Sequence, residues 1–177
     1  MIIDGGVCTV GIESTVVDLS GDTPIVLRPG MISPAQLEQA LGRAVGTQDS
    51  RFDVTTDVHS AARSPGLSVR HYAPRADVWL VHPSDRAEVR GALPASIGRG
   101  KVAALVFDAT FPSSVQLPPE SLVITMPAEP AGYAQRLYAA LHEVDRSDTA
   151  VILIEQPPET PEWYAIRDRL TRAAAIP

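Results

Sequence analysis

The chain has 177 residues, of which 45% are hydrophobic and 20% charged, and its formal net charge is −6. This acidic balance argues against a broad electrostatic grip on nucleic acid, which needs clustered Lys and Arg. The single cysteine, Cys8, excludes an internal disulfide and a Cys-based zinc site. No apolar run reaches the length of a membrane-spanning helix, and the first residues lack the pattern of a signal peptide. We therefore expect a soluble cytoplasmic protein.

The first block, residues 1–45, opens with two predicted strands. Residues 14–19 and 25–28 are short runs rich in β-branched side chains, and the polar residues between them are typical of a turn. A hairpin of these strands would bring Ser14 and Arg28 to neighbouring positions. The two side chains would then be placed to serve one ligand.

A helix is predicted next in the same block. Ser33 has the side chain of an N-cap, Pro34 suits the first helical position, and Gln36 completes a capping box. Gly42 is expected to end the helix. Two strands and one short helix bury too little surface to fold alone. We therefore interpret this block as the tail of a larger α/β unit.

The second block, residues 46–75, shows no periodicity and contains the run Arg70-His71-Tyr72. A stretch of this length without clear elements is usually functional or a linker. Passive tethers favour Gly, Ser, Glu and Lys, so an Arg-His-Tyr run is unusual for one. Two interpretations stay open. The segment lies over a ligand, with Arg70 or His71 facing a phosphate, or Tyr72 packs on a domain surface.

The third block, residues 76–177, alternates apolar runs of strand length with segments of helical spacing. The predicted strands are 78–81, 102–107, 122–125 and 150–154. Three helices are predicted: one capped by Ser84 and closed by Pro94, one over 133–144, and one after Thr160. Apolar strands separated by helices indicate a Rossmann-like, mostly parallel sheet covered on both faces. No glycine fingerprint follows a strand, so a dinucleotide is not implied.

Two candidate anion-binding features lie in the first block. Ser14 and Thr15 carry hydroxyls at the opening of a strand, where they can donate to a carboxylate or phosphate or satisfy nearby backbone groups. Arg28 precedes Pro29-Gly30 at a strand end, and its planar fork suits phosphate or carboxylate. The alternative is a solvated surface arginine. Both interpretations stay open on spacing alone.

The remaining polar residues suggest no catalytic chemistry. Cys8 has no base beside it in the sequence, and we expect it to be a small buried residue. The histidines are scattered without metal-ligand spacing. Four acidic residues flank the strand at 150–154, and we expect a solvated polar edge and no metal site there: Asp145, Asp148, Glu155 and Glu159.

Several motifs, taken in chain order, resemble those of the two-domain threonylcarbamoyl-AMP synthases. Residues 4–6, 11–18 and 27–30 resemble the closing segment of that family's YrdC-type catalytic domain. Ser64-Pro65-Gly66 followed by residues 70–74 resembles its interdomain linker. The resemblance therefore starts near the beginning of the chain.

The last block extends this resemblance. Residues 133–145 and 165–174 look like the C-terminal domain of the same family. The resemblance implies a catalytic-domain tail at 1–45, a linker at 46–75 and a Rossmann-like domain at 76–177.

A reaction is also implied by the resemblance. The family joins L-threonine, bicarbonate and ATP into threonylcarbamoyl-AMP, with release of pyrophosphate, for the threonylcarbamoyladenosine modification of tRNA. Magnesium would accompany ATP. By resemblance Ser14 would contact L-threonine and Arg28 the nucleotide, while Arg70, His71 and Tyr72 would belong to a linker that folds over the site. The tRNA-modification machinery would be an indirect partner.

The chain departs from the family pattern in ways that bear on activity. The Lys-x-Arg and Ser-x-Asn motifs of the family's catalytic domain are absent, and Val69 stands where a tyrosine is usual. Without these groups most ligand positioning is lost. We expect that the polypeptide alone does not synthesise the adenylate and that a further N-terminal half completes it. The alternatives are a non-catalytic regulatory or partner-docking module and an unrelated nucleotide-binding protein.

Overall fold

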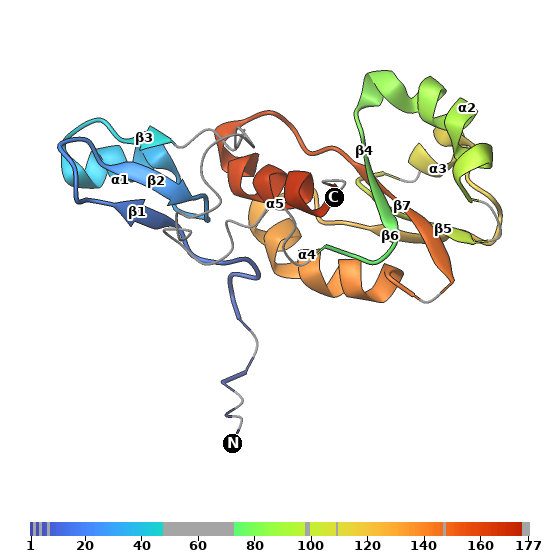
Figure 1. Cartoon of the computed structure of the whole chain (residues 1–177), viewed down its shortest axis with the longest axis horizontal. Coiled ribbons are helices and arrows are strands. Elements are labelled where there is room, and N and C mark those ends of the chain that lie inside the picture. The colour runs from blue at the N-terminus through green and yellow to red at the C-terminus, as the bar shows by residue number, and fades with distance from the viewer. Residues whose placement is uncertain are drawn as a thin grey trace, which may run out of the picture.

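The structure is a computed structural model. It describes residues 1, 3, 5–6, 8–47, 73–97, 100–108, 110–146 and 148–174. Two groups of elements follow one another along the chain, a small N-terminal unit and a larger C-terminal unit built on a parallel sheet (Figure 1).

The N-terminal unit is a three-stranded sheet with one helix. Its elements are β1 (Val16–Asp18), β2 (Ile25–Arg28), α1 (Pro34–Leu41) and β3 (Gly46–Thr47). β1 and β2 pair antiparallel with Val16 opposite Arg28, which confirms the predicted hairpin. β3 pairs parallel with β2 and was not predicted, because two residues carry no periodic signal.

Helix α1 begins and ends as the sequence predicts. The Ser33 hydroxyl accepts from the backbone N–H of Gln36 at 3.3 Å, and the Gln36 side chain accepts from the backbone N–H of Ser33 at 2.8 Å. Gly42 ends the helix with φ 66°, in the left-handed region that glycine tolerates. All eight residues of α1 are described, and all are at least partly exposed. Local capping therefore contributes more to this helix than burial does.

The C-terminal unit contains a four-stranded sheet in the order β4-β7-β5-β6, and every pairing in it is parallel. Its strands are β4 (Asp77–Val81), β5 (Lys101–Val106), β6 (Leu122–Thr125) and β7 (Thr149–Glu155). Its helices are α2 (Arg86–Ile97), α3 (Phe111–Val115), α4 (Pro130–Val144) and α5 (Tyr164–Ala174). This arrangement confirms the predicted parallel α/β fold.

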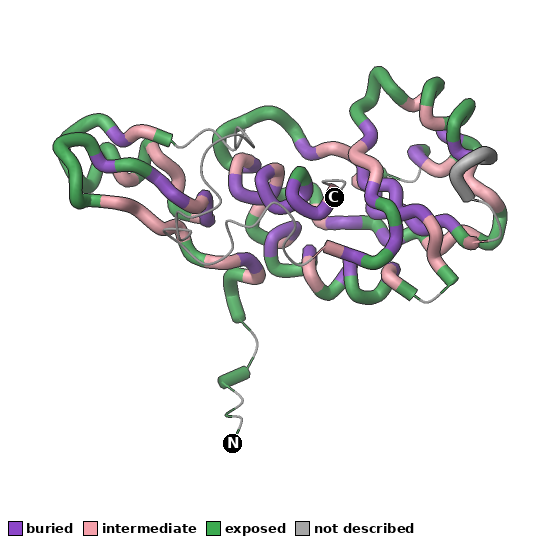
Figure 2. Tube along the Cα trace, in the orientation of Figure 1, coloured by how far each residue is buried: buried purple, intermediate pink, exposed green. Residues whose placement is uncertain are grey.

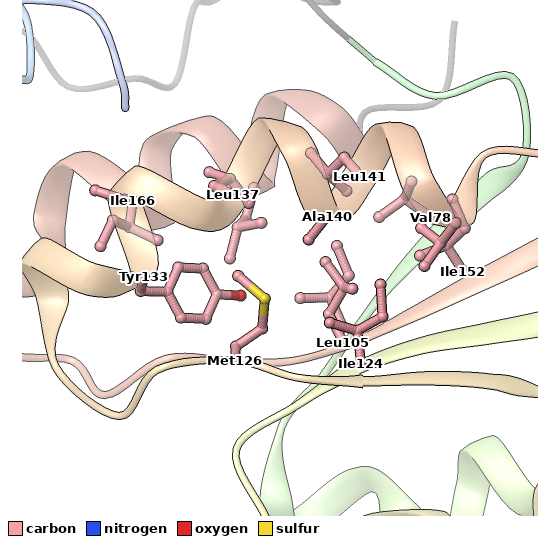
Figure 3. Packing of buried hydrophobic residues seen from close by; sticks show 14 of the residues in the cluster. Val78, Leu105, Ile124, Met126, Tyr133, Leu137, Ala140, Leu141, Ile152 and Ile166 are labelled. Atoms are coloured by element: carbon pink, nitrogen blue, oxygen red, sulfur yellow. The ribbon is translucent and has the colours of Figure 1, made fainter. Parts of the chain in front are cut away.

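Two hydrophobic clusters hold the sheet between its helices. On one face, Tyr133 and Leu137 of α4 and Ile166 of α5 pack over the inward side chains of the strands (Figure 3). On the other face, Leu93 of α2 and Phe111 of α3 do the same. Buried positions therefore concentrate in the C-terminal unit, whereas the N-terminal unit is largely exposed (Figure 2).

The start and end of α2 differ from the sequence prediction. The helix follows a 3-10 turn (Pro83–Asp85) whose N-cap is His82, and Ser84 donates its backbone N–H to the His82 ring instead of capping. Pro94 does not close the helix, which runs to Ile97. A proline inside a helix removes one helical hydrogen bond, and α2 continues for three residues beyond it. The short helix α3 was also missed, since five residues show no measurable helical period.

Candidate functional site

The predicted hairpin brings Ser14 and Arg28 into direct contact. Arg28 Nε donates to the Ser14 carbonyl at 3.1 Å, and Arg28 Nη2 donates to the Ser14 hydroxyl at 3.3 Å. Ser14 is exposed and Arg28 half-buried, so both sit at a surface that a ligand can reach. Because the Ser14 oxygen accepts from Arg28, its own hydrogen can donate to a carboxylate. We call these two residues the hairpin wall.

Close backbone packing beside Gly30 fixes the position of Ser14. A Cβ at Gly30 would collide with the backbone of Ser14 and Thr15, so only glycine allows this approach. The Thr15 hydroxyl donates to the carbonyl of Ile32 at 2.9 Å. Thr15 therefore follows the local-backbone alternative, whereas Ser14 has a side-chain partner across the hairpin.

A guanidinium from the C-terminal unit contacts the hairpin on both sides, just before β1 and just after β2. Arg169 of α5 donates through Nε to Glu13 Oε2 at 2.7 Å and through Nη2 to the carbonyl of Pro29 at 2.9 Å. Tyr138 of α4 donates its hydroxyl to both oxygens of Glu13, at 3.1 and 3.0 Å. Two helices of one unit thus hold one carboxylate of the other.

These contacts determine the ionisation of the three side chains. Burial opposes the charge on Glu13, but hydrogen bonds from Arg169, the backbone and Tyr138 outweigh it, so the Glu13 pKa lies below its usual value. Burial also disfavours the charged form of Arg169, but Glu13 and Asp168 more than compensate and raise its pKa. The pKa of Tyr138 is raised by burial and by the negative charge of Glu13. The cluster is therefore a charged pair with a neutral phenol donor.

Asp168 anchors the arginine that reaches the hairpin. Its Oδ2 accepts from Arg169 Nη1 at 2.6 Å and from Arg172 Nε at 3.0 Å, and its Oδ1 accepts from Arg172 Nη2 at 3.1 Å. The Asp168 side chain is 2% exposed and that of Arg169 is 7% exposed. A buried charge that is hydrogen-bonded on this many sides has little rotational freedom.

The segment before the hairpin lies directly against α4. A Cβ at Gly11 would collide with backbone atoms of Ala134 and Gln135. The Gln135 amide also donates to the carbonyl of Cys8 at 3.1 Å. This close contact and the Arg169 contacts join the two units at separate points.

Two cavities flank this junction. One, of about 630 Å³, is lined by residues 8 and 10–13 of the N-terminal segment together with Pro74, Tyr138 and His142. The other, of about 680 Å³, lies between α1 and α5 and includes Ser33, Thr160 and Arg167 in its lining.

Two expectations about polar residues are wrong. Cys8 is exposed and lines the first cavity, because the segment before Gly11 lies on the surface of α4 instead of entering a core. Glu155 is buried and does not belong to a solvated edge. It accepts from Arg86 Nη2 at 2.6 Å and from the backbone N–H of Phe107 at 2.7 Å. A cationic partner explains how this carboxylate is buried.

The other three acidic residues near β7 have separate partners. Asp145 accepts from the backbone N–H groups of Arg75 and Ala76 at 3.0 and 3.2 Å. Asp148 pairs with Lys101 at 2.6 Å, and Glu159 pairs with Arg167 at 2.8 Å. Among the described residues, no group of three or more His, Cys, Asp or Glu side chains is placed to hold a metal ion.

The candidate residues Arg70, His71 and Tyr72 lie outside the described residues. Sequence reasoning missed Glu13, Tyr138 and Arg169, although each lies inside a motif quoted for the family resemblance. One signal was available, because Asp168 and Arg172 are spaced i, i+4 as an ion pair on a helix. The long-range partners Glu13 and Arg169 had no such signal, since 156 residues separate them.

The family profile described as "Threonylcarbamoyl-AMP synthase, C-terminal domain" matches residues 32–175. Proteins named threonylcarbamoyl-AMP synthase are similar along nearly the whole chain. The relative from Schizosaccharomyces pombe is 29% identical over 99% of this chain and 45% of its own length. The relative from Pyrococcus abyssi is 30% identical over 98% and 48%, and that from Bacillus subtilis is 29% identical over 98% and 48%. The chain spans about half the length of the curated relatives it matches.

Two solved structures of P. abyssi Sua5 share the fold. One, in complex with L-threonine, has a TM-score of 0.74 and 28% identity over 97% of this chain and 48% of that one. The other, in which an adjacent histidine and tyrosine are replaced by alanine, has a TM-score of 0.75 and 27% identity over 97% and 47%. In the part of this chain that the structure describes, every helix is too short or too polar to cross a membrane.

Proposed function

The chain belongs to the family of threonylcarbamoyl-AMP synthase C-terminal domains, and from this premise we propose that it serves in an L-threonylcarbamoyladenylate synthase. The reaction joins L-threonine, bicarbonate and ATP into threonylcarbamoyl-AMP and releases pyrophosphate. Its product serves the threonylcarbamoyladenosine modification of tRNA in the cytoplasm. The chain contributes the hairpin wall to this reaction, and in this proposed role we call Ser14 and Arg28 the substrate wall.

The contact between Ser14 and Arg28 is the observation that carries the proposal. The Ser14 hydroxyl donates to the L-threonine carboxylate, and the Arg28 guanidinium faces the nucleotide phosphates. Arg28 Nη2 donates to the Ser14 hydroxyl oxygen at 3.3 Å, so this hydroxyl is oriented before a ligand binds. A relative of the same fold has been solved with L-threonine bound, which supports an L-threonine site in this family.

ATP enters with Mg²⁺ on its phosphates, as a substrate complex. The substrate wall supplies fixed hydrogen-bond donors and a fixed cation, and the reaction uses these for positioning and charge stabilisation. Bicarbonate is the third substrate.

By the family resemblance, the run Arg70-His71-Tyr72 is proposed to belong to the linker beside the same site. The sequence contains a single His-Tyr pair, His71-Tyr72. In one solved structure of the P. abyssi relative an adjacent His and Tyr are both replaced by alanine, and we therefore choose His71-Tyr72 for substitution. Alanine substitution of His71 and Tyr72 is expected to weaken ligand binding.

Titration of the 177-residue chain with L-threonine, followed by NMR, tests the proposal. We expect the Ser14 and Arg28 resonances to shift with L-threonine and not with D-threonine, and Ser14→Ala to abolish the response. An L-threonine response that is equally strong for D-threonine or for Ser14→Ala would overturn the assignment of Ser14. Unchanged spectra at millimolar L-threonine would also contradict the proposed substrate wall.

Pyrophosphate release measured with L-threonine, bicarbonate and ATP tests the catalytic statement separately. The sequence contains neither the Lys-x-Arg nor the Ser-x-Asn motif of the family. We therefore expect no turnover above the uncatalysed rate from this chain by itself. Robust turnover would show that other groups of the chain replace those motifs.

A second candidate function is a non-catalytic, partner-docking module, and one observation favours it. Large apolar side chains are exposed on the N-terminal unit, including Leu19 at 56% and Ile32 at 55%. A continuous surface of such side chains would favour contact with another protein chain over contact with water. The two candidates differ in the titration above, because a docking module would not respond to L-threonine.

A further inference from the structure

Arg169 contacts the two residues that adjoin the substrate wall in sequence. Glu13, which it binds through Nε at 2.7 Å, immediately precedes Ser14. Pro29, whose carbonyl it binds through Nη2 at 2.9 Å, immediately follows Arg28. One planar group from α5 therefore joins the segment that leads into β1 to the segment that leaves β2, next to Ser14 and Arg28 in the chain.

The orientation of Arg169 is itself fixed from the opposite side. Its Nη1 donates to Asp168 at 2.6 Å, and Asp168 is held by two further bonds from Arg172. With 7% of its side chain exposed, Arg169 has little room for another rotamer. The guanidinium thus behaves as a rigid spacer between α5 and the hairpin.

We propose that Arg169 is a positioning residue that sets the spacing of Ser14 and Arg28 from within the C-terminal unit. The functional meaning of this inference rests on the proposed function, because that function makes Ser14 and Arg28 ligand contacts. Small displacements of positioning groups lower ligand binding and rate far more than they lower stability. The C-terminal unit would then shape the substrate wall without touching substrate.

A guanidinium is required for this role, and an ammonium is not equivalent. Arg169 serves three acceptors in one plane, on Glu13, Pro29 and Asp168. Lysine keeps the charge but presents a point donor on a flexible stem, so it cannot span Glu13 and Pro29 together. Arg169→Lys therefore separates positioning from simple charge pairing.

NMR of the arginine Nε–H groups in the 177-residue chain tests the inference without any ligand. Arg28 Nε–H donates to Ser14, so its resonance reports the geometry of the wall. We expect Arg169→Lys to shift this resonance. Arg136→Lys, at an exposed pair on α4, is the control.

An unchanged Arg28 resonance in a folded Arg169→Lys variant would overturn the inference, as would equal shifts in the Arg169 and Arg136 variants. If Arg169→Lys does not fold, Glu13→Gln takes its place, since it weakens the Arg169 contact with residue 13 and keeps the contact with the Pro29 carbonyl. We expect it to shift the same resonance by a smaller amount. An unshifted resonance there would also overturn the inference.

L-threonine titration of the same variants adds a binding readout. We expect Arg169→Lys to weaken binding about tenfold, the effect of one misplaced hydrogen bond. A wild-type chain whose spectrum does not change with L-threonine would contradict the proposed function. The Arg28 Nε–H resonance in the Arg169 variant would still decide the role of Arg169. Equal affinity of wild type and Arg169→Lys would overturn the positioning role itself.

Discussion

Arg28 donates to both the carbonyl and the hydroxyl oxygen of Ser14, at 3.1 and 3.3 Å, across the β1–β2 hairpin. The register places Val16 opposite Arg28, so the arginine reaches beyond the first residue of β1 to Ser14, two positions earlier in the chain. Both contacts therefore depend on the hairpin and on the length of the arginine side chain.

Replacement of Arg28 by lysine is expected to reduce ligand binding much more than stability. Lysine cannot make the Nε and Nη2 contacts together, so the Ser14 dipole loses its orientation. Because the pair lies at the surface, we expect the free energy of unfolding to fall by at most about 1 kcal/mol. Urea denaturation and L-threonine titration of the same variant measure the two effects. A large loss of stability would assign Arg28 a structural role instead.

The close approach of Gly11 to α4 gives a stability prediction with a matched control. Gly11→Ala places a Cβ against the backbone of Ala134 and Gln135, which has to move. We expect a loss of about 1–3 kcal/mol in the free energy of unfolding, as in other overpacked sites. A Cβ at Gly21 has open space, so Gly21→Ala should change stability by less than about 0.5 kcal/mol. Urea denaturation compares the two, and equal effects would contradict the packing.

Much of the fold could be predicted from local signals in the sequence. The α1 cap at Ser33 and the apolar runs of β5 and β7 each specify their element within a few residues. The contact of Ser14 with Arg28 followed from one hairpin. The junction of Glu13, Tyr138 and Arg169 could not be predicted, because it forms between distant segments and has no period. The predictions that Cys8 is buried and that Glu155 is solvated were wrong for the same reason, because tertiary packing decides the exposure of both side chains.

The buried pair of Arg86 and Glu155 is expected to be costly to break from one side. Arg86→Met removes the cation that pairs with the Glu155 carboxylate, whose side chain is 8% exposed. It also removes the cation–π contact of Arg86 with Phe111, at 5.2 Å from the ring centroid. We expect a loss of about 3 kcal/mol in the free energy of unfolding. Arg136→Met, which breaks an exposed pair on α4, should cost below about 1 kcal/mol. Comparable losses in urea denaturation would show that Glu155 is solvated.

The ionisation of Glu13 predicts how stability depends on pH. Burial raises the pKa of Glu13, but the hydrogen bonds from Arg169 and the other donors outweigh burial. The Glu13 pKa in the folded chain therefore lies below its usual value of 4.5. Below pH 4.5 the unfolded chain therefore binds this proton more readily than the folded chain does. The contribution of Glu13 is thus fully present above pH 4.5 and is lost as pH falls through the folded pKa. Glu13→Gln removes this titration.

We accordingly expect Glu13→Gln to be less stable than wild type near neutral pH, with the difference shrinking as pH falls. Urea denaturation at a series of acidic pH values measures this difference. Glu143→Gln, at the exposed pair with Arg136, is the control, and its difference from wild type should stay small throughout. Because Glu13 is mostly shielded from solvent, added salt should change its contribution less than that of an exposed pair. A Glu13→Gln difference that is constant with pH would mean that the carboxylate is not selectively stabilised in the fold, and the Arg169 contact would then contribute geometry without charge.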